Sequence, residues 1–68
     1  MIAIEKSGHG YRARATPPNV RSAWETERPL SAREIASKLL ELGAHQTDIG
    51  DAFYQADPNW ISNLDALP

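Results

Sequence analysis

Histidine and carboxylate side chains near the middle of the chain are the residues that could hold a metal ion. His45, Asp48 and Asp51 follow one another at intervals of three, and imidazole and carboxylate groups both bind zinc. A metal site needs three or four converging ligands in a recognisable pattern, whereas this spacing is generic and Asp48 also suits the start of a helix. His9 stands between two glycines, where we expect an exposed loop. We therefore expect no metal site and no cofactor.

Serine hydroxyls are the candidate nucleophiles, because the chain has no cysteine. None of the serines lies in the glycine-flanked pattern of a nucleophile elbow. Gly8-His9-Gly10 lacks the following helix and lysine of a phosphate-binding loop. Carboxylates are plentiful, but a chain of 68 residues is short for a cleft enclosed enough to tune them for catalysis. The sequence therefore predicts a protein that is not an enzyme and has no catalytic residue.

Positive charge is concentrated in the first part of the chain. All seven Lys and Arg residues lie at positions 1–38 together with four Glu, which gives that segment a net charge of +3. Positions 39–68 hold five Asp and Glu and no Lys or Arg, a net charge of −5. Such segregation can mark a binding face, or folding can interleave the segments so that the charges only solvate the surface. The basic candidates for contact with nucleic acid are Lys6, Arg12, Arg14 and Arg21.

A group of aromatic residues lies inside the acidic segment, at Phe53, Tyr54 and Trp60. One alternative is that these side chains belong to the core. The other is that a domain of this size leaves one of them exposed beside a carboxylate, where it could anchor a protein partner. The candidate protein-binding residues are Tyr54, Asp57 and Trp60.

The elements that must position these residues begin with an expected hairpin. Residues 2–5 and 11–15 alternate between apolar and polar side chains, which is typical of strands. The glycines at positions 8 and 10 favour a tight turn between them. Closing the turn at residues 6 and 11 puts Ile4 opposite Ala13 and Glu5 opposite Arg12, so apolar residues face each other and opposite charges pair.

A third strand is predicted at residues 21–26, after the prolines at positions 17 and 18 end the second. Pairing Ala13 with Trp24 leaves space for the indole and sets Glu25 opposite Arg12. The face expected to form the core carries Ile2, Ile4, Tyr11, Ala13, Ala15, Ser22 and Trp24. The face expected to meet water carries Ala3, Glu5, Arg12, Arg14, Ala23 and Glu25.

Helices are predicted in the second half of the chain. Ser31 and Glu34 form a capping box for a helix over about residues 32–42, and Gly43 is a natural stop for it. A second helix should run from near Thr47 to Ala56, and a third short turn should follow, with Asp57 as its cap. Residues 65–68 are expected to fray.

Packing the leucine-rich helix against the apolar face of the sheet buries both surfaces. The prediction is one α+β domain over residues 1–68 with the order β-β-β-α-α. A three-stranded antiparallel sheet occupies about residues 1–27, and two or three short helices on one face occupy about residues 31–64.

In topology this expected fold resembles the AP2-type and integrase-arm DNA-binding domains, which lay a helix-backed three-stranded sheet in the major groove. The match rests on the order of elements and on the strand Tyr11-Arg12-Ala13-Arg14, and it implies DNA binding through those arginines. The chain departs from that pattern in its net negative charge and in Glu5 and Glu25, which would neutralise Arg12 and repel phosphate. Residues 39–53 are also similar to a helix-turn-helix, but the second helix has no Lys or Arg to meet DNA.

The leading hypothesis is a small non-enzymatic accessory or adaptor protein that acts by contact with another protein. The alternative hypothesis is nucleic-acid binding through the arginine-bearing face of the sheet. The absence of cysteine favours a reducing compartment, and no segment is apolar enough for a signal peptide or a membrane span. We therefore expect a cytoplasmic protein with no membrane partner.

Overall fold

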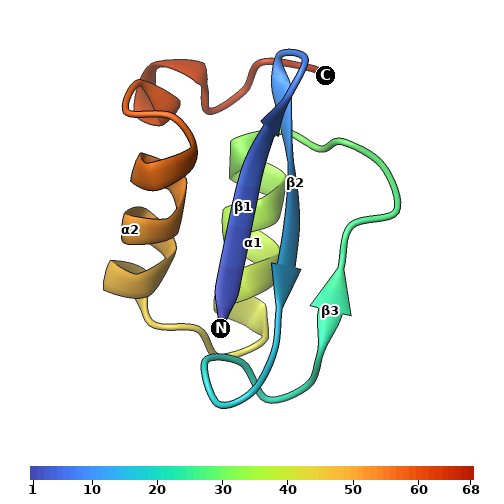
Figure 1. Cartoon of the computed structure of the whole chain (residues 1–68), viewed down its shortest axis with the longest axis vertical. Coiled ribbons are helices and arrows are strands. Elements are labelled where there is room, and N and C mark those ends of the chain that lie inside the picture. The colour runs from blue at the N-terminus through green and yellow to red at the C-terminus, as the bar shows by residue number, and fades with distance from the viewer.

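A computed structural model describes all 68 residues of the chain. The strands β1 (Ile2–Ser7), β2 (Gly10–Ala15) and β3 (Trp24–Glu25) form an antiparallel sheet in the order β1-β2-β3. The helices α1 (Ala32–Glu41) and α2 (Gln46–Ala56) follow, and then a 3-10 turn, η1 (Trp60–Asn63). Figure 1 shows α1 behind the sheet and α2 beside β1. The predicted α+β fold with the order β-β-β-α-α is confirmed.

The first hairpin has the predicted register. Ile4 lies opposite Ala13 and Glu5 lies opposite Arg12. The turn between the strands has Gly8 at a φ of 62°, whereas His9 has no positive φ. A positive φ at the first central residue only is the pattern of a type II′ turn, whose twist matches that of the flanking strands.

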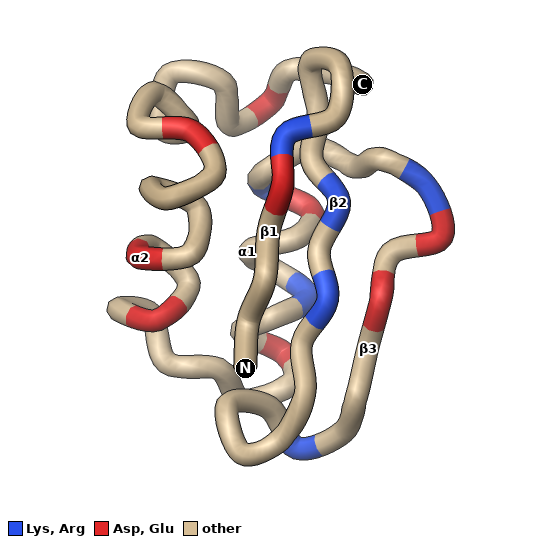
Figure 2. Tube along the Cα trace, viewed as in Figure 1, with Lys and Arg blue, Asp and Glu red and all other residues tan.

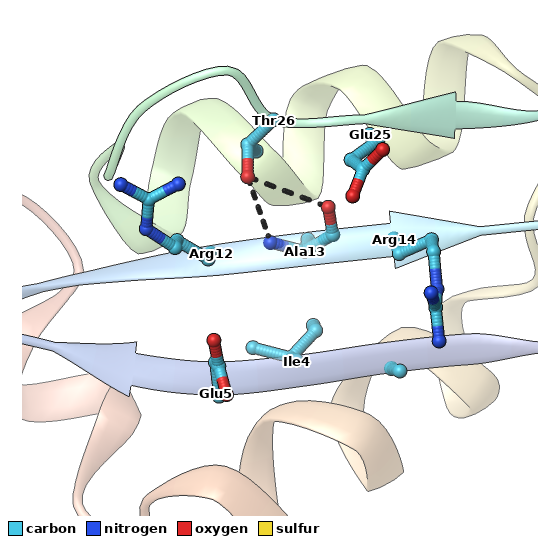
Figure 3. A pocket seen from close by; sticks show the side chains of 8 residues that line it. Ile4, Glu5, Arg12, Ala13, Arg14, Glu25 and Thr26 are labelled. Carbon is cyan, nitrogen blue, oxygen red and sulfur yellow. Dashed lines mark hydrogen bonds between the residues drawn. The ribbon is translucent and has the colours of Figure 1, made fainter.

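The predicted register of the third strand is wrong by two residues. Trp24 lies opposite Ala15 and not Ala13, and Glu25 lies opposite Arg14 and not Arg12. Thr26 takes the place opposite Ala13, where its N–H donates to the Ala13 carbonyl at 3.0 Å. The Thr26 hydroxyl oxygen also accepts from the Ala13 N–H at 3.1 Å (Figure 3). A shift by two keeps each side chain on its predicted face, because side chains alternate with a period of two.

Two contacts explain why the third strand starts later than predicted. Val20 is buried in the core, and the Arg21 N–H donates to the Leu42 carbonyl at 2.9 Å. These contacts hold residues 20 and 21 near the end of α1 and away from β2, so only Trp24 and Glu25 remain as strand. As a result Ser22 is exposed, and Trp24 packs against the core while only partly buried.

Both helices have clear local start and stop signals. The Ser31–Glu34 capping box is present in α1. Gly43 has a φ of 92°, and two bonds close the helix end, from the Gly43 N–H to the Leu40 carbonyl and from the Ala44 N–H to the Leu39 carbonyl. This is a Schellman arrangement, which favours glycine at the left-handed position. The helix α2 begins at Gln46, with His45 as its N-cap.

The core lies between the sheet and the two helices and includes Tyr11, Val20, Ile35, Leu39 and Phe53. The residues predicted to fray make contacts at their start: the Asp65 carboxylate accepts two hydrogen bonds from the Arg33 guanidinium. That pair is exposed and so adds little stability. None of the helices has both the length and the apolar character needed to cross a membrane.

Candidate functional site

Asp57 is a junction of the fold and not the exposed rim residue of the sequence-based hypothesis. It is the C-cap of α2 and is almost fully buried. Its Oδ2 accepts from the Tyr11 hydroxyl at 2.8 Å and lies 3.5 Å from the Lys6 Nζ, while its Oδ1 accepts from the Asn59 N–H at 3.0 Å. The carboxylate therefore ties β1, β2 and the turn before η1 to the end of α2. The predicted capping of the last turn by Asp57 is wrong: the N-cap of η1 is Asn59, which makes no side-chain cap bond, and the bond from Asn59 to Asp57 lies in the turn before η1.

These contacts shift two pKa values in opposite directions. The backbone N–H of Asn59, followed by the Tyr11 hydroxyl and Lys6, holds the pKa of Asp57 below its usual value. Burial, followed by the bond to Asp57, raises the pKa of Tyr11 to about 12. Asp57 stays charged and Tyr11 stays protonated near neutral pH. Because neither group changes its protonation state there, the pair is suited to a structural hydrogen bond.

The late aromatic group divides between core and surface. Phe53 is fully buried and meets Tyr11 edge to face with ring centroids 5.3 Å apart. Trp60 is stacked on Phe53 with centroids 4.6 Å apart and is only partly buried. Tyr54 has 62% of its surface exposed. The structure thus places Tyr54 outside the core and makes Trp60 a packing residue with one open side.

A second exposed apolar side chain lies on η1, the turn that packs against α2. Ile61 is 66% exposed. Tyr54 lies on α2 and Ile61 on η1, and the Phe53–Trp60 stack packs these two elements against each other. We call Tyr54 and Ile61 the Tyr54 surface. The sequence-based reasoning missed Ile61, since its place in a short turn carries no signal of exposure.

The arginine-bearing face of the sheet is open to solvent. A shallow hollow of about 420 Å³ lies on it, lined by Arg12, Arg14 and Thr26 and by Glu5 and Glu25 among others. Figure 3 shows the two arginine side chains pointing in opposite directions, with Arg14 crossing toward β1 and Arg12 toward the segment after β3. Neither guanidinium forms an ion pair or a hydrogen bond. The expected neutralisation of Arg12 by direct pairing with Glu5 and Glu25 is therefore absent.

The four basic candidates do not lie on one surface. Lys6 is directed to the helix side of the sheet, where its ammonium lies 3.5 Å from Asp57 and 5.0 Å from the centre of the Tyr11 ring. Arg21 lies in the loop before β3, and its guanidinium donates to the Glu41 carbonyl at the end of α1. Only Arg12 and Arg14 share the open face of the sheet. Figure 2 shows positive charge on β2 and only negative charge along α2.

The histidines and their neighbouring carboxylates have structural positions. His45 Nδ1 accepts from the Thr47 N–H at 3.1 Å and so caps α2. Asp48 lies in the first turn of α2, as predicted, and accepts from the Asn19 side chain at 3.4 Å. The structure gathers no group of three or more His, Cys, Asp or Glu side chains that could hold a metal ion. His9 is exposed at the hairpin turn.

Comparison with protein-family models, with curated proteins and with solved structures finds no match to this chain.

Proposed function

We propose that this protein is a non-enzymatic adaptor that binds another protein through the Tyr54 surface. The observation that carries the proposal is the 62% exposure of Tyr54 on a helix whose preceding residue, Phe53, is fully buried. The Phe53–Trp60 stack holds this part of the molecule in one arrangement. Aromatic side chains on rigid supports are frequent anchors of protein interfaces, because they bury a large area and lose little conformational entropy.

The charge around this surface defines the partner. Residues 39–68 contain no Lys or Arg, and α2 carries Asp48 and Asp51 on its exposed side. A complementary partner has an apolar pocket for the tyrosine ring and basic residues at its rim, because opposite potentials guide association and exclude other partners. The cytoplasm is the location we propose for this contact, since a chain without cysteine is suited to a reducing compartment.

Site-specific photocrosslinking in cells tests the proposal. A photoreactive phenylalanine derivative at position 54 should give a discrete crosslinked product with another protein, and the same group at position 28 should not. Position 28 is the matched control because Arg28 is also exposed and lies in the loop after β3, across the sheet from α2. The crosslinked protein should then bind the purified chain, and Tyr54→Ala should weaken that binding at least tenfold while far-UV circular dichroism stays unchanged. Equal crosslinking from positions 54 and 28, or unchanged binding by Tyr54→Ala, would refute the proposal.

A second candidate is binding of nucleic acid by Arg12 and Arg14. The observation in its favour is that both guanidinium groups are free of ion pairs on the open face of the sheet. Two arginines flanked by Glu5 and Glu25 offer few phosphate contacts, so we expect no binding of duplex DNA or RNA tighter than about 10⁻⁴ M at physiological salt. Fluorescence anisotropy with a labelled 20-base-pair duplex decides this. Micromolar binding that is lost in Arg12→Ala/Arg14→Ala would make the second candidate the better one.

A further inference from the structure

The two edges of the sheet differ in how they are protected. On one edge β3 has only two residues, and the pairing with β2 resumes at Leu30, whose backbone exchanges two hydrogen bonds with Tyr11. The residues between Thr26 and Leu30 leave the ladder and include Pro29, so that edge is short, bulged and blocked by proline. On the other edge β1 is six residues long and has neither a bulge nor a proline. Sheet edges normally carry such protection because unpaired backbone groups invite another strand.

The alternation of hydrogen-bonded and non-bonded pairs between β1 and β2 shows which backbone groups of β1 have no partner on β2. Met1 and Thr16 exchange two bonds, from the Met1 nitrogen to the Thr16 carbonyl and from the Thr16 N–H to the Met1 carbonyl. In an antiparallel ladder bonded pairs alternate with non-bonded pairs, so Ala3 and Glu5 also bond to β2. The N–H and C=O groups of Ile2 and Ile4 consequently point away from β2, toward the open edge.

The helix α2 runs beside this edge. We call the residues of α2 that face the start of β1 the ledge; they are Asp48, Asp51, Ala52 and Gln55. Figure 1 shows α2 displaced to the outer side of β1 and running along it. A hollow of about 250 Å³ lies at the start of β1, lined by Met1, Ile2 and Asn19 on one side and by the ledge on the other. Elsewhere α2 packs against β1. A strand added to β1 would lie about 4.8 Å from it, and only its part beside Ile2 would lie over this hollow. Ile2 and Ile4 remain only partly buried although they face the helices, so the added strand would also cover apolar surface.

The charge of the ledge sets the chemistry of the added strand. Asp51 is exposed and has no hydrogen-bond or ion-pair partner, and Asp48 has only the 3.4 Å contact from the Asn19 amide. No Lys or Arg lies on α2. Alternate side chains of an added strand point to the same face, so every second residue would reach the ledge. Lys or Arg at those positions would meet the two carboxylates.

We propose that β1 accepts an extended segment of another protein as a fourth strand of the sheet, with Lys or Arg at alternate positions over Asp48 and Asp51. The backbone groups of Ile2 and Ile4 form the ladder, and the ledge selects the charge. This site is separate from the Tyr54 surface and does not depend on it.

Amide hydrogen exchange of the free protein is the first test. The amides of Ile2 and Ile4 should exchange rapidly, whereas those of Ala3 and Glu5 should be protected by their bonds to β2. Protection of Ile2 and Ile4 equal to that of their neighbours would overturn the proposal, because the edge would then be closed.

Titration of the ¹⁵N-labelled protein with model peptides is the second test. The probe is a capped eight-residue peptide of alternating valine and lysine, compared with its valine–glutamate counterpart and with a version N-methylated on the edge that would pair. The lysine peptide should shift and slow the exchange of the Ile2 and Ile4 amides, and the other two should bind at least about fivefold more weakly. Asp48→Asn and Asp51→Asn should each weaken the lysine peptide about two- to fivefold, the range for partly exposed ion pairs.

The matched control is Glu27→Gln, which removes a carboxylate on the opposite edge and should leave the affinity unchanged. Equal binding of the N-methylated peptide would show that no ladder forms, and equal binding of the glutamate peptide would show that the ledge does not select charge. Either result overturns the proposal, as do shifts confined to the Tyr54 surface or an absence of binding at millimolar peptide.

Discussion

The Tyr11 hydroxyl donates to the Asp57 carboxylate at 2.8 Å, which joins the middle strand of the sheet to the end of α2 across 46 residues of sequence. Tyr11 is fully buried and Asp57 nearly so, so the bond is shielded from water. Hydrogen bonds to charged groups contribute more than neutral ones, and a buried acceptor left without its donor costs its desolvation energy. This pair is therefore the main polar contact between the sheet and the C-terminal part of the chain.

Replacing Tyr11 with phenylalanine should lower the free energy of unfolding by about 1.5–3 kcal/mol, the range for a hydrogen bond to a charged group. The ring packing against Phe53 is kept, so the loss reports the hydroxyl alone. Urea unfolding followed by circular dichroism measures it. Tyr54→Phe is the control, because it removes a hydroxyl from a mostly exposed ring and should change stability by less than about 0.5 kcal/mol. Equal effects of the two substitutions would contradict the role assigned to the pair.

Acid should destabilise the protein partly through Asp57. The folded-state pKa of Asp57 lies below its unfolded value, so its contribution is complete above about pH 4 and is lost as the pH falls through the folded-state pKa. Asp57→Asn should therefore be less stable than the parent protein at pH 7 and should lose less stability between pH 5 and pH 2. Urea midpoints across that range measure the difference. The matched control is Asp51→Asn, whose carboxylate is exposed on α2, and it should change the urea midpoint at pH 7 less than Asp57→Asn does.

Alkali should destabilise the protein through Tyr11. Its folded-state pKa is raised to about 12, so its contribution is complete below the unfolded value of about 10 and is lost as the pH rises from there through 12. Absorbance at 295 nm should show a late ionisation step near pH 12, which belongs to Tyr11. In Tyr11→Phe the late step should disappear. A late step that survives this substitution would show that it belongs to another group.

Two glycines should respond to alanine in opposite directions. Gly50 lies inside α2 and a Cβ there meets no atom within 4 Å, so Gly50→Ala should stabilise the protein by about 0.5–1 kcal/mol. Gly43 has a φ of 92°, and its Cβ would lie 2.9 Å from the Arg21 Nη1, so Gly43→Ala should be destabilising. Thermal unfolding should show a higher midpoint temperature for Gly50→Ala and a lower one for Gly43→Ala than for the parent protein. A destabilising Gly50→Ala would mean that the helix cannot accept a side chain at this position.

The N-cap of α2 should tolerate only residues that can accept a hydrogen bond. His45→Ala removes the Nδ1 acceptor of the Thr47 N–H and should cost about 0.5–2 kcal/mol. His45→Asn should recover most of that loss, because asparagine is a favourable N-cap. Chemical unfolding at pH 8 compares the three proteins. Equal stability of the alanine and asparagine variants would show that the cap contributes nothing.

Features of the fold with local causes were predictable from the sequence. The hairpin register follows from the turn glycines and the alternation of residues 2–5, and the start and end of α1 follow from Ser31, Glu34 and Gly43. The register of β3 has no such local cause. It depends on the burial of Val20 and on the bond between Arg21 and Leu42, both of which join distant parts of the chain.

In the candidate site, too, the features with local causes were predictable and those that depend on distant contacts were not. The exposure of Tyr54 agrees with its place on the polar side of the α2 pattern, opposite Ile49 and Phe53. The burial of Asp57 could not be anticipated, because its partner Tyr11 lies on another element and an aspartate before proline is equally typical of a surface turn. The capping role of His45 was missed since histidine is not a favoured N-cap residue.

The segment between Thr26 and Leu30 leaves the strand ladder and returns to it with both flanking pairs intact. Because neither pair depends on what connects them, the number of residues in between is free to change, and lengthening such a loop costs little entropy. Glu27 and Arg28 are exposed there, across the sheet from α2. An affinity tag or a small reporter domain spliced in at this point would leave the Tyr54 surface and the β1 edge unobstructed, which gives a handle for isolating whatever the protein binds.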